Sequence, residues 1–501
     1  MRRSSLPWVV AAVLLLSFAL FLHYYSSVFM DDMFISLRYA QNAAHGQGIA
    51  YNPGERFEGY SNFLFVLLEV GGMRFVRDPF LLAKALAFFA YTLFSIAFLS
   101  AVRAFSGGKM LLFAAVILVF DPVFIAAANL GLETSLFHLL LLLLFLMYWY
   151  RGQMRFPWWS LLAVGCILAR PEGVLFVGIT WIAEAWVRRE WQTWFSWGHL
   201  AVLLVFLGYT GWRWEYYGGL ATGPALFKGA NSNFFGDPQG LIVDKLKAVA
   251  LFHIYFFIPL LGTAIFVWRH VRERANFRAY LAAFALLGYL FTMVLHAAIF
   301  TDYANYYRYH GQVVPFVFLA FFLVLGDAWR LPRFRRWAMC AAILVLAILP
   351  YRVAKLNASL AAVRDRDAQY FIAGEFLKRL NCGPGEALLS VHDAGIVPFT
   401  SGLKTLDWWL NDREAATLIN KRDPAGWRDY IISRRPDLFF ISNYSWSRTT
   451  LSPFLEKEYA PIWQWKNDNN DLLILKRNGL KCAQQNLPLD PVRYHFQSET
   501  L

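Results

Sequence analysis

The sequence predicts a membrane-embedded, all-α bundle of about eleven transmembrane helices, followed by a soluble α/β domain. Of the 501 residues, 58% are hydrophobic and only 16% are charged. A soluble protein of this length could not bury so much apolar surface, so lipid is the solvent for most of the chain. The composition turns polar near residue 353, which divides the chain into a membrane domain, 1–352, and a soluble domain, 353–501.

Eleven apolar stretches predict the helices of the membrane domain. The stretch 158–187 is counted as two, because Ala169-Arg170-Pro171-Glu172-Gly173 interrupts it and proline and glycine favour a turn there. The predicted spans are 7–25, 80–102, 110–128, 133–150, 158–169, 171–187, 197–215, 248–268, 279–300, 311–328 and 337–352.

The basic residues predict the orientation of these spans. With the break at 169–173, the Arg-rich connections all fall on the side of Arg2 and Arg3, which the positive-inside rule places in the cytoplasm. The first span resembles the apolar part of a signal peptide, but no small-x-small cleavage site follows, so we expect it to be retained. The loop 26–79 and the soluble domain then lie on the outer face.

The net charge of +13 is explained by the Arg-rich connections on the cytoplasmic side and does not indicate nucleic-acid binding.

The soluble domain shows alternating helix and strand patterns. We expect helices at 362–380 and 424–434, and strands at Ala387–Val391, 404–407, Asp437–Ser442 and Asn470–Lys476. Cys382 and Cys482 flank this region and form a plausible disulfide on the outer face. The other two cysteines lie in apolar spans, and no Cys/His spacing indicates zinc.

Two adjacent carboxylates, Asp31 and Asp32, stand where the first span meets water. One interpretation is a cap for a helix predicted at 33–44. The other is catalysis, because close carboxylates raise one pKa and provide a base. Arg38 and Asn42 are four residues apart and share one face of the predicted helix.

This region resembles the first periplasmic loop of bacterial GT-C glycosyltransferases of the arabinofuranosyltransferase-like branch. The resemblance rests on Asp31-Asp32-x-Phe-Ile-x-Leu-Arg38-Tyr-Ala-x-Asn42, Gly46-x-Gly48, Tyr51-Asn-Pro-Gly-Glu-Arg56 and Glu58-Gly-Tyr60-Ser-Asn62. Gly131–Leu136 and Ala169–Gly173 also resemble the family, and His392–Gly395, Leu406-Asp407 and Asn411-Asp412 do so more weakly.

The resemblance implies a GT-C fold in the bacterial inner membrane, with the N-terminus cytoplasmic and the soluble domain periplasmic. Such an enzyme takes a sugar from a polyprenyl-phosphate carrier and transfers it to an acceptor outside the cytoplasm. Asp31 or Asp32 would be the acceptor-side carboxylate, and Glu58, Tyr60 and Asn62 would belong to the substrate site. The sequence departs from the family pattern after Asn62 and at 302–310, so the sugar itself stays open.

Further candidate site residues each have a structural alternative. Arg170 and Glu172 would contact the donor phosphate or hold the broken helix as a charge pair. Glu133 would belong to the site or complement a helix dipole. Asp302, Arg308 and His310 would form a sugar or phosphate platform or an interfacial belt. Lys228 is a further phosphate candidate, and Asp393 and Asp407 stand at strand ends, where either ligands or turns are expected.

The resemblance therefore implies a glycosyltransferase whose donor is a polyprenyl-phosphate monosaccharide, with arabinofuranose as one candidate sugar. The acceptor would be a periplasmic glycan, lipopolysaccharide or a protein. A divalent cation (Mg²⁺, Mn²⁺ or Ca²⁺) at the Asp pair stays an alternative, because no further oxygen ligand can be identified. The rival functions are a transporter or flippase for a lipid-linked sugar, although no repeat halves are visible, a non-catalytic assembly subunit, and an O-antigen ligase or polymerase.

Overall fold

The computed structural model describes residues 6–24, 30–154, 156–189, 196–227, 238–274, 276–298, 310–382, 387–442, 445–466 and 471–484. Lys228, Asp302 and Arg308, proposed from the sequence as site residues, lie outside these ranges. His310 begins the short 3₁₀ helix η4 (His310–Gln312), and its side chain is also outside the described part.

Each predicted apolar span corresponds to a helix or to a bent pair of helices. The single helices are α1 (Leu6–Tyr24), α4 (Pro79–Ser106), α7 (Thr134–Trp149), α8 (Trp158–Ala169), α9 (Gly173–Arg188), α10 (Trp197–Tyr217), α14 (Phe277–Ala298) and α15 (Val314–Arg330). The pairs are α5 (Leu111–Phe120) with α6 (Pro122–Asn129), bent by 56°, and α12 (Pro238–Tyr255) with α13 (Phe257–His270), bent by 81°. Within the described residues, four helices are long and apolar enough to cross a membrane, or six with each bent pair counted once. The count of eleven crossings stays a prediction.

The predicted break between the fifth and sixth spans is confirmed. Helix α8 ends at Ala169 and α9 begins at Gly173. A Cβ atom on Gly173 would lie 2.0 Å from the carbonyl oxygen of Cys166, a distance that no side chain tolerates. Glycine at this position therefore lets the two helices meet in a tight turn.

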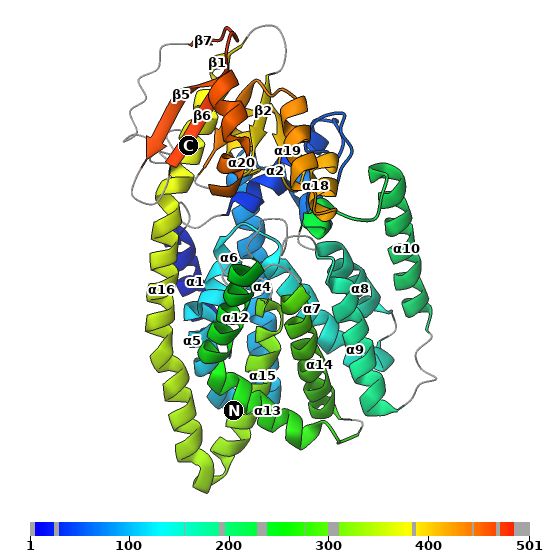
Figure 1. Ribbon diagram of the computed structural model, residues 1–501. Coiled ribbons are helices and arrows are strands. Elements are labelled where there is room, and N and C mark those ends of the chain that lie inside the picture. The colour runs from blue at the N-terminus through cyan, green and yellow to red at the C-terminus, as the bar shows by residue number, and fades with distance from the viewer. Residues whose placement is uncertain are drawn as a thin grey trace.

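The predicted span 337–352 and most of the helix predicted at 362–380 belong to a single helix. One helix of 47 residues, α16 (Pro332–Lys378), continues from the bundle into the soluble domain, with Pro350 inside it. Tertiary contacts stabilise the helix at this point, because the buried Arg352 forms a bidentate ion pair with Asp121 (2.5 and 3.1 Å) and stacks on Phe256. Figure 1 shows α16 running along one edge of the bundle up to the sheet.

The C-terminal region that the sequence predicts to be soluble, called the soluble domain below, contains a five-stranded mixed sheet in the order β3-β2-β4-β6-β5. Strands β2 (Leu388–Val391), β3 (Lys404–Asp407) and β4 (Leu438–Ile441) are parallel, whereas β6 (Asp471–Arg477) and β5 (Tyr459–Lys466) are antiparallel to their neighbours. The predicted strands correspond to β2, β3, β4 and β6, and β5 was not predicted. The connecting helices are α17 (Ile396–Ser401), α18 (Arg413–Asn420), α19 (Pro424–Ser433) and α20 (Ser445–Glu458).

The first loop lies between the bundle and this domain. It contains α2 (Asp31–Ala44) and α3 (Phe63–Gly72). In Figure 1, α2 stands at the end of the bundle that carries the sheet. Met33, Leu37 and Phe34 of α2 belong to a hydrophobic cluster that also contains residues of the bundle and of β2, β4 and β6. One hydrophobic core therefore joins the two domains at this end.

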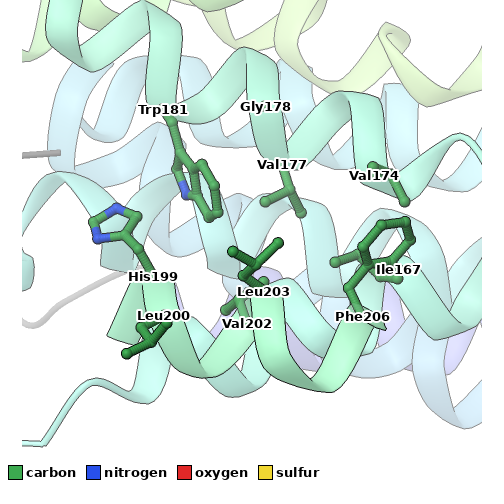
Figure 2. Close-up of a pocket in the computed structure, with 10 residues that line it drawn as sticks. All are labelled: Ile167, Val174, Val177, Gly178, Trp181, His199, Leu200, Val202, Leu203 and Phe206. Carbon is green, nitrogen blue, oxygen red and sulfur yellow. The ribbon is translucent and has the colours of Figure 1, made fainter. Parts of the chain in front are cut away.

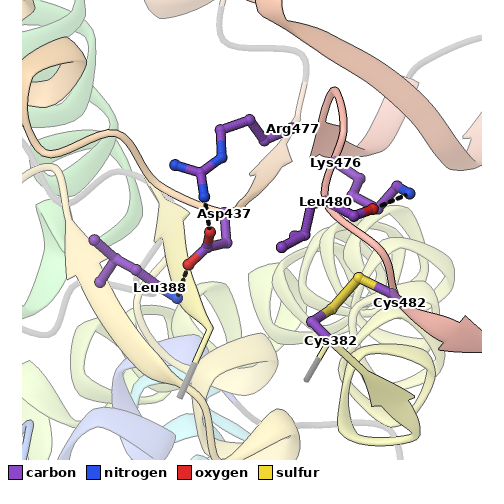
Figure 3. Close-up of a disulfide and its surroundings, with 7 residues drawn as sticks. All are labelled: Cys382, Leu388, Asp437, Lys476, Arg477, Leu480 and Cys482. Carbon is purple, nitrogen blue, oxygen red and sulfur yellow. Dashed lines mark hydrogen bonds and ion pairs between the residues drawn. A yellow bond between two sulfur atoms is a disulfide. The ribbon is translucent and has the colours of Figure 1, made fainter. Parts of the chain in front are cut away.

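The predicted disulfide between Cys382 and Cys482 is present. It lies beside a small antiparallel pair formed by β1 (Leu380–Asn381) and β7 (Ala483–Gln484). Figure 3 shows the bond near Asp437, which accepts hydrogen bonds from the Leu388 backbone N–H and from Arg477. The disulfide thus joins the start and the end of the sheet domain.

We expect loss of this disulfide to destabilise the soluble domain. It links residues 100 positions apart, and closing a loop of that length lowers the free energy of the folded state relative to the unfolded chain by about 4.7 kcal/mol. The double variant Cys382→Ser/Cys482→Ser should therefore unfold at a lower urea concentration than wild type. Unfolding is measured by tryptophan fluorescence. The exposed cysteine variant Cys340→Ser is the control, and equal midpoints for the two proteins would contradict the prediction.

Candidate functional site

The two predicted catalytic carboxylates lie at the N-terminus of α2 and have different surroundings. Asp31 accepts hydrogen bonds from the backbone N–H groups of Gly395 and Ile396, both at 2.8 Å. These N–H groups open α17, so Asp31 caps a helix of the soluble domain instead of its own. A Cβ atom on Gly395 would lie 2.0 Å from the Asp31 carbonyl oxygen, so glycine is required for this close approach.

Asp31 also faces carboxylates of the soluble domain. Burial, and the charge of Asp393, raise the pKa of Asp31 well above its usual range. Burial also opposes ionisation of Asp393, but His392 and the hydrogen bond from Tyr370 hold the pKa of Asp393 at about 2. Asp393 is therefore ionised at neutral pH and disfavours charge on Asp31.

Asp32 and Ser36 are four residues apart and share another face of α2. The Ser36 hydroxyl lies 3.0 Å from the Asn62 amide nitrogen, and this nitrogen donates to Oε2 of Glu133 at 3.0 Å. Ser36, Asn62 and Glu133 are buried, whereas Asp32 is half-buried. The face of α2 that carries Asp32 is thus linked to the membrane bundle, and the face that carries Asp31 is linked to the soluble domain.

A buried charge network continues from Glu133 into the bundle. Arg170 donates from Nη1 to Glu133 at 2.5 Å and from Nε to Glu172 at 2.6 Å, and Gln312 donates to Glu172 at 2.5 Å. The Glu133 and Arg170 side chains are 0% and 2% exposed. The structure therefore brings together three predicted site residues from the α6–α7 and α8–α9 connections.

Sequence reasoning missed Glu69, which belongs to the same region. Its side chain is fully buried, and neither carboxylate oxygen has a hydrogen-bond partner in the described part of the chain. It is close enough to Glu133 for the two carboxylates to repel each other. The sequence contains a signal that could have identified it, because Glu69 is the one ionisable residue of the apolar helix α3. Ionisable residues in apolar helices are candidates for function.

Glu58 and Tyr60 connect the first loop to α10. Glu58 accepts two hydrogen bonds from Arg213, at 2.8 and 2.6 Å, and the Tyr60 hydroxyl lies 2.9 Å from that of Tyr217. Burial raises the pKa of Glu58, although Arg213 opposes the shift. Arg213 was not predicted, because a helix-end arginine in this sequence also fits an interfacial anchor.

Arg38 and Asn42 contact backbone carbonyl groups. Asn42 donates to the carbonyls of Ala50 and Tyr51, at 2.8 and 3.0 Å. Arg38 donates to Tyr51 at 2.8 Å and to Leu403 and Pro398 of the soluble domain. These contacts order the loop, and in this arrangement the Arg38 guanidinium faces protein carbonyls.

Asp393 follows β2 and Asp407 is the last residue of β3, so both lie at the carboxyl edge of the parallel strands. Asp407 accepts from the backbone N–H groups of Trp409, Leu410 and Asn411 at 2.7–3.0 Å. Burial raises its pKa to about 6 against these hydrogen bonds. This geometry is that of a turn-forming aspartate, and Asp393 alone of the two lies beside Asp31.

The described residues do not support a cation at the Asp pair. Among them, no three His, Cys, Asp or Glu side chains are close enough together to hold a metal ion. Both carboxylate oxygens of Asp31 already accept backbone hydrogen bonds.

An apolar pocket of about 420 Å³ lies elsewhere, between α8, α9 and α10. Figure 2 shows Trp181 and His199 at one end of it, and Ile167, Val174 and Phe206 at the other. His199 also hydrogen-bonds to Tyr148 at 2.8 Å. This lining suits a hydrocarbon chain, and the pocket contains none of the site residues predicted from the sequence.

Comparisons with known proteins support the fold. Residues 361–486 match a family model described as a domain of unknown function (DUF8728), and no curated protein sequence matches the chain. The structure is similar to that of ArnT from Cupriavidus metallidurans in the apo state, with a TM-score of 0.61 and 14% identity over 93% of this chain and 97% of that chain. It is also similar to ArnT bound to undecaprenyl phosphate, with a TM-score of 0.60 and 14% identity over 94% and 98% of the two chains. The chain described here therefore shares its fold with ArnT.

Proposed function

We propose that the protein is a GT-C glycosyltransferase of the bacterial inner membrane, which transfers a monosaccharide from a polyprenyl-phosphate carrier to an acceptor on the periplasmic side. The main support is the position of α2, which holds two carboxylates between the bundle and the soluble domain in a fold shared with ArnT, a protein solved with undecaprenyl phosphate. The disulfide supports the periplasmic location of the soluble domain, because such bonds persist in oxidising compartments.

Asp32 is the proposed catalytic base. The Asp31 carboxylate is held by two backbone N–H groups of the soluble domain, whereas Asp32 lies on the face of α2 that leads through Ser36 and Asn62 to Glu133. In the proposed reaction, Asp32 accepts the proton of the acceptor hydroxyl while the oxygen of that hydroxyl attacks the anomeric carbon of the donor sugar. The bond from that carbon to the phosphate oxygen breaks, and polyprenyl phosphate leaves with the electron pair.

Arg170 has a positioning role in this proposal. Two of its nitrogens are bound to the carboxylates of Glu133 and Glu172. Two carboxylates bound to one guanidinium offset its positive charge and weaken its attraction for a phosphate group. The leaving phosphate is therefore assigned to basic residues outside the described ranges, Lys228 and Arg308, and Glu133 is the group that Arg170 and Asn62 hold in place.

The test uses purified protein in nanodiscs, supplied with a panel of polyprenyl-phosphate monosaccharides, arabinofuranose among them, and with periplasmic glycan, lipopolysaccharide or protein acceptors. We expect sugar transfer from one donor, with release of an equal amount of polyprenyl phosphate. Protein-free nanodiscs are the control. Movement of the donor between leaflets of proteoliposomes without transfer would favour a flippase instead, and transfer only from lipid-linked oligosaccharides would favour an O-antigen ligase or polymerase.

A further inference from the structure

Four side chains of the first loop bind the backbone of the soluble domain between residues 394 and 405. Arg38 donates to the carbonyl oxygens of Leu403, at 2.7 Å, and Pro398. Asp31 accepts from Gly395 and Ile396. Asp31 and Arg38 are seven residues apart, so one face of α2 makes both contacts.

Tyr51 and Asn52, which follow α2 in the loop, extend this contact. The Tyr51 hydroxyl donates to the Ala394 carbonyl at 2.6 Å. The Asn52 amide donates to the Thr405 carbonyl at 2.7 Å and accepts from the Thr405 N–H at 3.0 Å. Thr405 lies in β3, an edge strand of the sheet, so the Asn52 side chain pairs with that edge as a neighbouring strand would.

In these seven hydrogen bonds the partners on the domain side are main-chain atoms of the β2–α17–β3 crossover. Main-chain atoms take these positions only when the crossover is folded. Helix α2 has 14 residues and no side-chain cap at its N-terminus, and an isolated helix of this length is marginal in water. Its orientation therefore depends on the soluble domain.

We propose that the soluble domain, which includes the matched domain of unknown function, positions the first loop, which carries Asp32. Asp31, Arg38, Tyr51 and Asn52, together called the loop clasp, fix α2 against the crossover so that Asp32 faces the acceptor. This inference rests on the proposed transfer reaction. The four side chains are assigned as positioning residues, because each of them is bound to main-chain atoms of the crossover.

The test compares two tyrosine variants that remove the same kind of bond. Tyr51→Phe removes the hydrogen bond to Ala394, and Tyr459→Phe removes one of equal length, 2.6 Å, to Pro436 inside the soluble domain. Both hydroxyls are buried, so the cost to stability should be similar. Asn52→Asp is added to Tyr51→Phe, because it removes the donor to Thr405 and keeps the acceptor.

We expect Tyr51→Phe/Asn52→Asp to lower kcat by about 100-fold, as a displacement of about 1 Å does in other active sites, with the KM for the donor changed less than threefold. Tyr459→Phe should leave kcat within about twofold of wild type, because Tyr459 lies inside the soluble domain and away from the first loop. Hydrogen exchange of residues 31–44 should accelerate in the double variant only.

Azide as the acceptor separates mispositioning from general damage. Azide attacks the anomeric carbon, polyprenyl phosphate leaves and no proton is transferred, so no base is needed. Azide transfer by the double variant should stay within about threefold of wild type. A kcat equal to that of Tyr459→Phe, or an equal loss of transfer to azide and to the hydroxyl acceptor, would overturn the inference. If the wild-type protein transfers no sugar, the proposed function fails. Hydrogen exchange of residues 31–44, compared between wild type and the double variant, then decides by itself whether the loop clasp holds α2.

Discussion

Asp32→Asn is expected to lower sugar transfer by about 10³-fold while the protein stays folded, because a positioned general base contributes rate factors of this order. The amide is nearly isosteric with the carboxylate but cannot accept the acceptor proton. Transfer to azide should persist, since that reaction needs no base. The measurement is the initial rate of polyprenyl-phosphate release with each acceptor.

Asp31→Asn should behave differently from Asp32→Asn. An amide oxygen can accept one of the N–H groups of Gly395 and Ile396, but its NH₂ group opposes the other. We therefore expect a lower thermal midpoint, faster hydrogen exchange in residues 31–44 and a smaller loss of kcat. The exposed Asp365, 68% accessible on α16, provides the control Asp365→Asn. Loss of transfer in Asp31→Asn with full activity in Asp32→Asn would reverse the assignment of the base.

Arg170→Met is expected to destabilise the protein by about 3–5 kcal/mol, because it leaves the buried Glu133 and Glu172 carboxylates without their counter-charge. The measurement is the unfolding midpoint in detergent, followed by tryptophan fluorescence. The triple variant Arg170→Met/Glu133→Gln/Glu172→Gln also removes the two unpaired carboxylate charges. It should recover most of the stability lost in Arg170→Met. This recovery would show that the uncompensated charge, and not the lost volume, is the cause.

Arg330→Met is the matched control for this prediction. Arg330 also pairs with a carboxylate near a helix end, Asp327, but at 3.5 Å and with 62% of its side chain exposed. Exposed pairs contribute about 0–1 kcal/mol, so this variant should unfold close to wild type. Equal shifts for Arg170→Met and Arg330→Met would contradict the view that the buried network holds the α8–α9 turn.

The contacts at α2 explain why the first loop and the soluble domain act together in this proposal. The hydrogen bond between Asp31 and Gly395 joins residues 364 positions apart, and the bond between Asn62 and Glu133 joins the loop to the bundle. Helix α2 is thus held from both sides. A change in the domain would reach Asp32 through main-chain atoms, without passing through the bundle.

The sequence by itself determined the features that depend on local patterns. Apolar length located the helices, Pro171 and Gly173 located the turn between α8 and α9, and alternation with turn residues located β2, β3, β4 and β6. The pairing of Cys382 with Cys482 followed from the two cysteines flanking one polar region. These features are readable because periodicity, proline and glycine act over a few neighbouring residues.

Only the tertiary structure separated Asp31 from Asp32, turned Arg38 towards carbonyl groups and brought Glu69 beside Glu133. It also decided that α16 continues past residue 352, because Arg352 binds Asp121, 231 positions away. Neighbouring residues of a helix point about 100° apart, so Asp31 and Asp32 necessarily occupy different faces. Which face meets which partner depends on how distant segments pack, and no local pattern of residues contains that information.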